Sequence, residues 1–425
     1  MDIKIKQRIE LIKNGQVPQG YKKTKVGIVP EDWDVKSLIY LCIGKGTYGI
    51  NAPGCDYNEN LPLYLRITDI DDFGKYTKEN RVCVNDKESY KFYLKENDLL
   101  FARTGATTGK TYLYNKDDGD LVFAGFLIKF SINNKIANSY IISQYCKMSR
   151  YWNWVNMIST RSGQPGINAE EYSKLKLPYI KNLKEQQKIA DILTTQDKLI
   201  ELKQKLIEEK EKQKKYLMQN LLTGKIRLKG FNDKWEKARL KDLTKINNGG
   251  TPKTSILEYF NGNIYWASIK DLTNCNKFLY NTEKTITKLG LENSSAKIYP
   301  INSILFSMYA CIGEICICKV PCSSSQAILG ITCNDKLNYE FLYYYFLNLK
   351  PKIKLQGQCG TQNNLNKIIV SNLQFLLPPL EEQNKIAEIL SKADEEIELL
   401  KRDLEQEKDK KKALMQLLLT GIVRV

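Results

Sequence analysis

EQQKIADIL (185–193) and EQNKIAEIL (382–390) decide how this chain of 425 residues folds, because one nine-residue pattern occurs twice at an offset of 197 residues. LMQNLLTG (217–224) falls on LMQLLLTG (414–421) at the same offset, so the match runs through both segments without a gap. Self-similarity at a fixed offset indicates a duplicated structural unit. We therefore interpret the chain as one unit that occurs twice.

Both repeated segments carry the residue spacing of a coiled-coil seam. Their apolar residues recur mainly at alternating steps of four and three, which is typical of a helix that packs along another helix. A helix over 185–222 would be about 57 Å long at 1.5 Å per residue. Gly224 and Gly421 stand where each helix can end in the left-handed conformation. The residues expected to pair the helices are Ile189, Leu193, Ile200 and Ile207 in the first segment and Ile386, Leu390, Ile397, Leu400 and Leu404 in the second.

The charges of the two segments favour pairing between them. Residues 181–229 hold 13 basic and 7 acidic side chains, whereas residues 381–425 hold 9 basic and 11 acidic ones. Opposite net charges stabilise a pair of different helices over a pair of identical ones. Since a long connection separates the segments, we expect them to run antiparallel, as a rod with one module at each end.

Weaker matches, in the same order, precede each helix. They predict two copies of a variable module and align Trp33 with Trp235. The matched blocks are EDWDVKSL (31–38) with DKWEKARL (233–240), YLRITD (64–69) with WASIKD (266–271), NDLLFARTGATTG (97–109) with NSILFSMYACIG (302–313), and SGQPGIN (162–168) with GTQNNLN (360–366).

Composition excludes several kinds of chemistry. Histidine is absent, which rules out His-based acid–base catalysis, Ser-His-Asp triads and imidazole metal ligands. The 11 cysteines are an odd number, so we expect free thiols. The densest group, Cys311, Cys316, Cys318 and Cys322, has no C-x-x-C spacing, and Cys316 and Cys318 would share one face of a strand. Buried cysteine packs as a small apolar residue more often than it binds metal, so we expect no metal on this chain.

Nothing in the sequence predicts a membrane span. No apolar run approaches the ~20 residues that a bilayer crossing needs. The first residues, MDIKIKQRIELIKNG (1–15), resemble a charged amphipathic helix rather than a signal peptide. We therefore expect a cytoplasmic protein.

The net charge of +17 is spread over both modules, which suits contact with a polyanion at several places. Arginine is the more informative basic residue, because a guanidinium can form two parallel hydrogen bonds with a guanine edge. Arg66, Arg103 and Arg161 all lie in matched blocks of the first module, where the second module has Ser268, Met308 and no arginine. If these loops touch bases, the two modules read different sequences. The alternative is that these are ordinary surface arginines.

One glycine-rich stretch resembles a phosphate-binding P-loop. GATTGK (105–110) has three residues between its glycines instead of four, and the second module has Glu314 in place of Lys110. A nucleotide site needs that positive charge. We therefore interpret Gly105 and Gly109 as turn glycines that follow a strand.

Two aromatic-rich segments could serve as platforms for base stacking. They are YIISQYCKMSRYWNWV (140–155) and YEFLYYYFLNL (339–349). Aromatic residues at helical spacing more often belong to a hydrophobic core, and we favour that interpretation.

Four features occur together in this chain. They are the repeated helix with its EQ-x-K-I-A and L-L-T-G motifs, the W-x-x-x-x-L entry to each module, the GATTGK turn and the G-x-x-N/Q-x-N block. This combination resembles the DNA sequence specificity subunit of a Type I restriction-modification system. The resemblance covers essentially the whole chain, from Gly27 to the final LLTG-x-x-R.

The resemblance implies an α+β fold. Two mixed α/β target recognition domains in a pseudo-twofold arrangement would be separated by two long antiparallel helices that form a coiled coil. The expected segments are an N-terminal helix and entry (1–36), target recognition domain 1 (37–180), conserved spacer helix 1 (181–229), target recognition domain 2 (230–380) and conserved spacer helix 2 (381–425).

By the same resemblance, each recognition domain would read one half of a split, asymmetric site in double-stranded DNA. The helices would act as a spacer and as a docking surface for modification subunits. The candidate DNA contacts are Arg66, Thr68, Arg103, Thr104, Thr107, Lys110, Arg161, Gln164, Lys253, Lys270, Tyr309, Gln362, Asn363 and Asn364.

The resemblance also implies a non-catalytic chain. In this family the methyl transfer, usually to adenine N6, belongs to a separate subunit, and this chain contains no N-P-P-aromatic motif, F-x-G-x-G fingerprint or P-D dipeptide. The expected partners are DNA, two methylation subunits, and restriction subunits that bind the methylation–specificity complex. S-adenosylmethionine, ATP and Mg would be bound by those partners. The alternatives are a helical scaffold with two protein-binding heads and an NTPase that uses Lys110.

Overall fold

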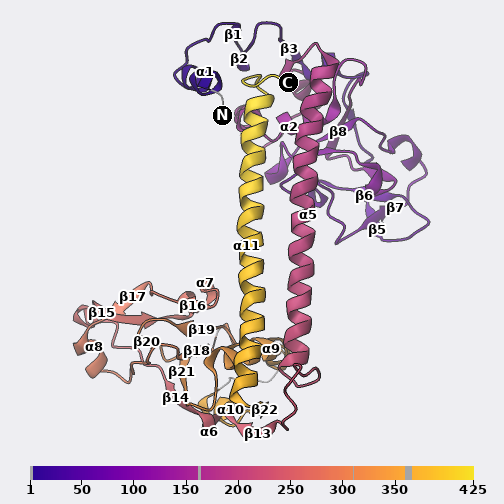
Figure 1. Ribbon diagram of the computed structural model, residues 1–425. Helices are drawn as coiled ribbons and strands as arrows, with labels where there is room; N and C mark the ends of the chain where they lie inside the picture. Colours follow the sequence, from indigo (N-terminus) through magenta and orange to yellow (C-terminus); the bar gives the residue numbers. More distant parts are fainter. Residues whose placement is uncertain (1–2, 161–163, 310, 359–365) are drawn as a thin grey trace. The chain divides into compact units, whose positions relative to one another are not determined.

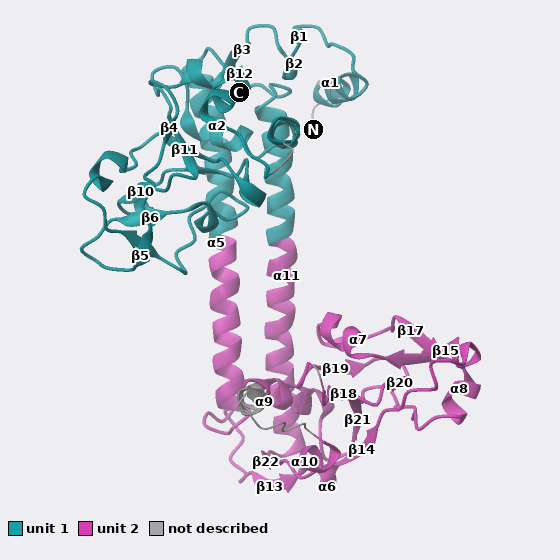
Figure 2. Ribbon diagram, turned by 180° about the vertical axis from the view of Figure 1, so that it is seen from behind, with its two compact units in different colours: residues 1–202, 404–425 teal, residues 203–403 magenta. Residues whose placement is uncertain are grey.

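The computed structural model of the chain describes residues 3–160, 164–309, 311–358 and 366–425 (Figure 1). The chain divides into two compact units: unit 1 contains residues 1–202 and 404–425, and unit 2 contains residues 203–403 (Figure 2). Helices α5 (Leu183–Leu221) and α11 (Leu380–Leu418) each contribute to both units. No helix in the described ranges is both long and apolar enough to cross a membrane.

Unit 1 is a mixed α/β unit built on two four-stranded sheets. The first sheet is antiparallel, in the order β4 (Thr47–Tyr48), β11 (Leu127–Ser131), β8 (Asp98–Ala102), β9 (Thr111–Leu113). The second has the order β10 (Leu121–Phe123), β6 (Leu63–Leu65), β7 (Val82–Val84), β5 (Gly54–Asp56), and β10 and β6 are parallel. Two antiparallel pairs complete the strands: β1 (Tyr21–Thr24) with β2 (Gly27–Pro30), and β3 (Asp34–Ser37) with β12 (Lys176–Tyr179). The shorter helices are α1 (Ile3–Lys13), α2 (Ser139–Tyr145), α3 (Ser149–Ser159) and α4 (Ala169–Ser173).

Strand β8 lies inside the first sheet and is buried on both faces. Leu99 and Phe101 belong to the core that includes helices α2 and α3, whereas Leu100 and Ala102 belong to a second core on the other face. Side chains alternate along a strand, so a strand that is covered on both sides needs an uninterrupted apolar run. The expected strand before the glycine-rich turn is confirmed.

Unit 2 has a similar plan, with five strands in its main sheet and three in its second sheet. Its main sheet has the order β14 (Thr244–Asn248), β21 (Ile328–Cys333), β18 (Ile304–Ser307), β19 (Ile315–Cys318), β16 (Phe278–Leu279). Its second sheet has the order β17 (Lys284–Ile286), β15 (Phe260–Ala267), β20 (Cys322–Ser324), and β13 (Glu236–Arg239) pairs with β22 (Gln374–Leu377). The shorter helices are α6 (Leu240–Leu243), α7 (Ile269–Asn274), α8 (Lys288–Glu292), α9 (Tyr339–Gln358) and α10 (Lys367–Ser371).

The aromatic-rich segments form core helices in both units. Tyr145 and Tyr151 are buried in the main core of unit 1, and Phe341, Tyr344 and Phe346 are buried in that of unit 2. The interpretation of these segments as core rather than as stacking platforms is therefore confirmed.

The repeated glutamine next to the start of each long helix ties that helix to its module. The backbone N–H of Asn138 donates to Oε1 of Gln186 at 2.6 Å, and the N–H of Asn338 donates to Oε1 of Gln383 at 2.8 Å. Gln186 is also buried, and its Nε2 donates to two backbone carbonyls. A buried carboxamide needs such partners, because an unpaired polar group away from water is costly.

Helices α5 and α11 have 39 residues each and run antiparallel where they pair. In unit 1, Asp197 pairs with Lys411 at 2.6 Å and Gln196 with Glu407 at 2.6 Å. In unit 2, Lys203 pairs with Asp403, Lys210 with Glu396, Glu211 with Lys401 and Lys214 with Asp394. In unit 2 the partner falls from Asp403 to Asp394 as α5 rises from Lys203 to Lys214. In unit 1 it falls from Arg424, just after α11, to Lys411 as α5 rises from Glu185 to Asp197, so the helices run antiparallel in each unit.

The expected pairing residues have different degrees of burial. Ile200 and Leu400 are half-buried. The other seven are buried, namely Ile189, Leu193, Ile207, Ile386, Leu390, Ile397 and Leu404. Gly224 (φ +69°) and Gly421 (φ +71°) lie in the left-handed region after the helices, as a C-terminal cap requires.

The mixed α/β units and the long antiparallel helices therefore confirm the expected fold class. The pseudo-twofold arrangement of the two units stays a prediction, as do the five segment limits. The expected limit between 36 and 37 falls inside β3, which pairs with β12 and so belongs to the first module.

Candidate nucleic-acid interface

Two sequence blocks that were matched separately lie against each other in unit 1. Thr104 forms an isolated β-bridge with Gly166, and the N–H of Gly105 donates to the carbonyl of Pro165 at 3.0 Å. The glycine-rich turn after β8 and the Q-P-G loop before α4 therefore form one continuous surface. Gln164 is exposed beside them.

The glycines of this turn are required by its geometry. Gly105 has φ +72° and Gly109 has φ +93°, where residues with a side chain are strained. A Cβ on Gly109 would lie 2.7 Å from Cγ1 of Val155, and one on Gly105 would lie 3.0 Å from Nε2 of Gln164. Their interpretation as turn glycines is confirmed.

Arg103 lies at the base of this turn with its guanidinium over an aromatic ring. The guanidinium carbon is 4.8 Å from the ring centroid of Tyr48, in β4. The Tyr48 hydroxyl accepts a hydrogen bond from the N–H of Ala169 at 3.1 Å, and the N–H of Arg103 donates to the carbonyl of Phe126 at 3.1 Å. Within the described ranges, Arg103 forms no ion pair. Tyr48, Arg103, Phe126 and Gln164 are called the Arg103 cluster below.

Arg66, in contrast, forms hydrogen bonds with residues of its own module. Its Nε and Nη2 donate to the carboxylate of Asp69 at 3.0 and 2.8 Å, and Nη2 is 3.4 Å from the carbonyl of Asn80. This pair raises the pKa of Arg66 through the hydrogen bond to Asp69. In unit 2, Ser268 caps the corresponding turn through Asp271, so the position serves a local cap in both units. Its neighbour Thr68 is exposed.

Lys110 is also paired. Its Nζ is 2.7 Å from Oδ1 of Asp72, and the hydrogen bond to Lys110 lowers the pKa of that carboxyl group. An ammonium that is held by a carboxylate suits a loop brace better than a phosphate cradle. Thr104 and Thr107 are half-buried, and the Thr107 hydroxyl donates to the Thr104 carbonyl at 3.3 Å.

The candidates in unit 2 are more scattered. Lys253 is exposed in the loop after β14, Lys270 is exposed on α7 and is 2.8 Å from Glu283, and Tyr309 is 39% exposed beside the buried Met308. Four further candidates, Arg161, Gln362, Asn363 and Asn364, lie outside the described residues.

Sequence reasoning missed three exposed residues at this surface. Tyr48 and Phe126 are 41% and 56% exposed in unit 1, and Asn248 is exposed in unit 2 at the position that corresponds to Tyr48. The sequence signal for Tyr48 and Asn248 was the weak match of KGTYGI (45–50) with INNGGTP (246–252). This match places each of the two residues immediately before a glycine. Their exposure depends on the sheet edge and could not be derived from that pattern.

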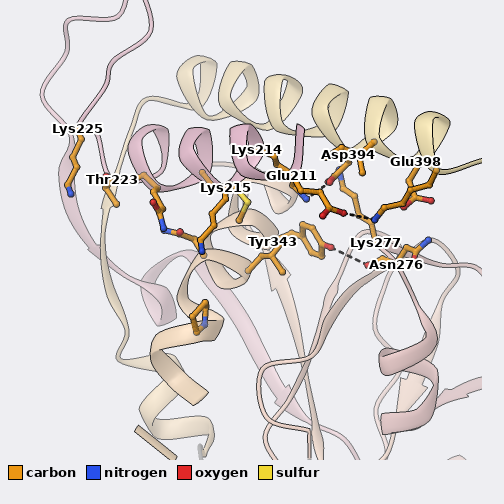
Figure 3. Close-up of a pocket in the computed structure, with 17 residues that line it drawn as sticks. Glu211, Lys214, Lys215, Thr223, Lys225, Asn276, Lys277, Tyr343, Asp394 and Glu398 are labelled. Atoms are coloured by element: carbon orange, nitrogen blue, oxygen red, sulfur yellow. Dashed lines mark hydrogen bonds and ion pairs between the residues drawn. The ribbon is translucent and has the colours of Figure 1, made fainter. Parts of the chain in front are cut away.

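Two wide hollows among the described residues lie in unit 2, between the long helices and the module that they carry. Figure 3 shows one of about 820 Å³, with Lys214, Asp394 and Tyr343 around it. Two ion pairs lie in its lining, Lys214 with Asp394 and Glu211 with Lys401, and the Tyr343 hydroxyl donates to the carbonyl of Asn276 at 3.2 Å. Nothing in this lining brings together an acid, a base and a nucleophile.

No metal-binding group of three or more acidic, cysteine or histidine residues occurs in the described part of the chain. Cys316 and Cys318 are both buried in β19 and face the same core, as expected. The hydrogen bond with Cys275 first, and burial next, raise the pKa of the Cys316 thiol, so that thiol packs as a neutral apolar group.

Comparison with known proteins agrees with this geometry. Residues 30–212 and 232–407 match the family described as Type I restriction modification DNA specificity domain. The Type I restriction enzyme MjaVIII specificity subunit of Methanocaldococcus jannaschii is 27% identical, with 93% of this chain and 94% of that protein covered. The Type I restriction enzyme HindI specificity subunit of Haemophilus influenzae is 30% identical over 37% of this chain and 36% of that protein.

Solved structures show the same fold. A chain from a study of complex assembly and conformational transition of the type I R-M system has a TM-score of 0.59 at 19% identity, covering 93% of this chain and 99% of that one. The Type I restriction-modification S subunit from M. genitalium has a TM-score of 0.56 at 14% identity, covering 91% and 96%.

Proposed function

Because this chain belongs to the family of Type I restriction-modification DNA specificity subunits, we propose that each of its modules reads one half of a split, asymmetric DNA site. This proposal rests on one observation: the same backbone hydrogen bond occurs in both units, but the side chains at that place differ. The N–H of Arg103 donates to the carbonyl of Phe126 at 3.1 Å, and the N–H of Met308 donates to that of Ala327 at 2.8 Å. The same place in the fold thus has arginine and phenylalanine in unit 1 and methionine and alanine in unit 2. Two readers with different chemistry suit two different half-sites.

The chain would supply recognition and leave the chemistry to its partners. Methylation subunits, two per specificity chain, would bind S-adenosylmethionine, and restriction subunits that join the methylation–specificity complex would bind ATP and Mg. This chain would bind none of these cofactors and would be non-catalytic. The assembly would act in the cytoplasm, where host and incoming DNA are both accessible.

The long helices would dock the methylation subunits. Large apolar side chains are exposed along them, namely Leu202, Leu206 and Tyr216 on α5 and Leu399 on α11. Exposed apolar groups on a helix that is already paired suit a further protein contact.

The helices would also set the distance between the two half-sites. A helix of 39 residues is about 58 Å long, more than one turn of B-DNA at roughly 34 Å. Lengthening both helices by four residues, about 6 Å, should widen the unread spacer and leave base preference unchanged. Exchange of 37–180 for another first module should change one half-site only. Altered base preference with a fixed spacer after the helix insertion would contradict this division of roles.

The direct test uses the full chain in complex with its methylation subunits. We expect tight binding to a split duplex site in gel-shift titrations, with affinity that falls steeply as salt rises, since phosphate contacts release counterions. Equal affinity for all duplexes would contradict DNA recognition. Retention of the same protein partners in a nuclease-treated lysate, without sequence-specific DNA binding, would favour a protein-binding scaffold.

A further inference from the structure

We infer that Arg103, whose guanidinium lies over the ring of Tyr48, reads a guanine in the half-site of the first module. This inference rests on the proposed function and names one of its base contacts. Three arginines lie in matched sequence blocks, and the structure describes two of them, Arg66 and Arg103. Arg66 is paired with Asp69, whereas Arg103 lies over Tyr48.

Arg103 differs from three other basic residues of its module, whose side chains are already hydrogen-bonded or ion-paired. Arg66 is bound by Asp69, Lys110 by Asp72, and Arg150 donates to the carbonyl of Val26. The described residues place no carboxylate on Arg103. Its hydrogen-bonding edge can therefore accept a ligand without breaking an ion pair.

The backbone of Arg103 is fixed from two directions. Its N–H donates to Phe126 at 3.1 Å, and its carbonyl accepts from the N–H of Ile167 at 2.9 Å. A side chain that starts from a fixed backbone loses less entropy when it binds, which favours a precise contact over a flexible one.

The Tyr48 ring orients the guanidinium. The ring is held in turn by the hydrogen bond from Ala169 to its hydroxyl. Stacking on a ring covers one flat face of the guanidinium and leaves its N–H edge open. That edge matches the O6 and N7 acceptors of guanine in the major groove, which form a bidentate pair with arginine.

The surroundings also suit a DNA contact. Tyr48, under the guanidinium, and Phe126, whose carbonyl accepts from the Arg103 N–H, are large and exposed, so they can pack on a thymine methyl or on the sugar–base surface. The corresponding place in unit 2 has no arginine, because the residue there is the buried Met308. The guanine contact is therefore specific to the first module.

The test compares variants of the full chain in complex with its methylation subunits. Wild-type complex is first bound to a library of randomised DNA duplexes, and the retained duplexes are sequenced to define both half-sites. We expect Arg103→Lys to reduce the preference for one G·C pair in one half-site by roughly 10- to 100-fold. Tyr48→Leu should weaken the same preference, whereas Tyr48→Phe, which keeps the ring, should keep it.

Arg81→Lys is the matched control, since Arg81 is exposed in the same module and is not a member of the Arg103 cluster. It should leave both half-sites unchanged. An unchanged site in Arg103→Lys would overturn the inference, and so would an equal loss of affinity on all duplexes in Arg103→Ala, which indicates a phosphate contact. Absence of any sequence preference in the wild-type complex would overturn the proposed function itself.

Discussion

Arg424, which follows helix α11, forms a two-pronged ion pair with Glu185 in the first turn of helix α5. Its Nη2 is 2.8 Å from Oε2 of Glu185, and its guanidinium lies 5.6 Å from the ring centroid of Trp33. Unit 2 contains the same arrangement, in which Arg227 pairs with Glu382. In each unit, the end of one long helix is therefore tied to the beginning of the other. This contact explains why the glutamate and the LLTG-x-x-R arginine occur in both repeats.

We expect Arg227→Ala to lower the free energy of unfolding by about 3 kcal/mol, because it leaves a buried carboxylate without its counter-ion. The side chain of Glu382 is fully buried, and its carboxylate also accepts a hydrogen bond from the indole N–H of Trp235 at 2.8 Å. Urea unfolding of the full chain measures the change. Arg402→Ala removes an exposed arginine from α11 in the same unit and should cost less than 0.5 kcal/mol. Equal losses in the two variants would show that the Arg227–Glu382 pair contributes no special stability.

Leucines on α5 provide a second matched pair. Leu193 is fully buried in the main core of unit 1, whereas Leu202 is 64% exposed on the same helix. We expect Leu193→Ala to lower the unfolding free energy by about 3 kcal/mol, through lost burial and a cavity, and Leu202→Ala to change it by less than 0.5 kcal/mol. Thermal or urea unfolding distinguishes the two. A small effect at Leu193 would mean that the seam is not closely packed.

Much of the fold could be predicted from the sequence because periodicity determines which face of a helix is apolar. Leu193 and Leu390 occupy the same seam position in the two repeats, and both are fully buried. The opposite charges of the two segments likewise correspond to interhelical ion pairs such as Lys210 with Glu396. Ile200 and Leu400 are only half-buried, because packing at the seam depends on neighbours that spacing does not specify.

The candidate site was less predictable, because residue type does not reveal which partner a charge has already found. Arg66 and Arg103 were equivalent as sequence candidates, yet only Arg66 is bound by a carboxylate from three residues further along the chain. The Tyr48 platform comes from another strand, so sequence proximity gave no indication of it. Contacts across a sheet are set by register, which one sequence does not show.

Lys147 gives the stability of unit 1 an unusual pH dependence. Burial first, and the nearby Lys411 next, lower its pKa to about 8, and Asp197, Asp71 and Lys75 also act on it. Between pH 8 and about 10.4, the unfolded chain binds the proton that the folded chain has released, so stability rises with pH in this window. Lys147→Met removes the penalty for charging this amine, and we expect it to stabilise the protein below pH 8 by up to ~3 kcal/mol.

The measurement for Lys147 is the difference in unfolding free energy between variant and wild type at pH 7, 8.5 and 10. This difference should shrink as pH rises above 8, because the folded wild-type chain has then released the proton from the buried amine and no longer carries the penalty for charging it. Lys176→Met removes an exposed lysine of the same module and serves as the control. A constant difference across the three pH values would refute the lowered pKa.

A substitution at Gly109 tests whether the turn after Arg103 depends on close packing against helix α3 as well as on a left-handed backbone. Gly109 and Gly44 both have positive φ, +93° and +77°, but a Cβ would meet Val155 at 2.7 Å in the first case and nothing within 4 Å in the second. Backbone strain alone costs about 1–2 kcal/mol, so Gly44→Ala should lose about 1 kcal/mol. Gly109→Ala adds overpacking and should lose about 3 kcal/mol. It should also weaken discrimination at the first half-site in duplex-binding assays, because the displaced turn begins at Arg103. Similar losses for both variants, with discrimination intact, would mean that helix α3 yields to the added methyl group and that the turn is not braced against it.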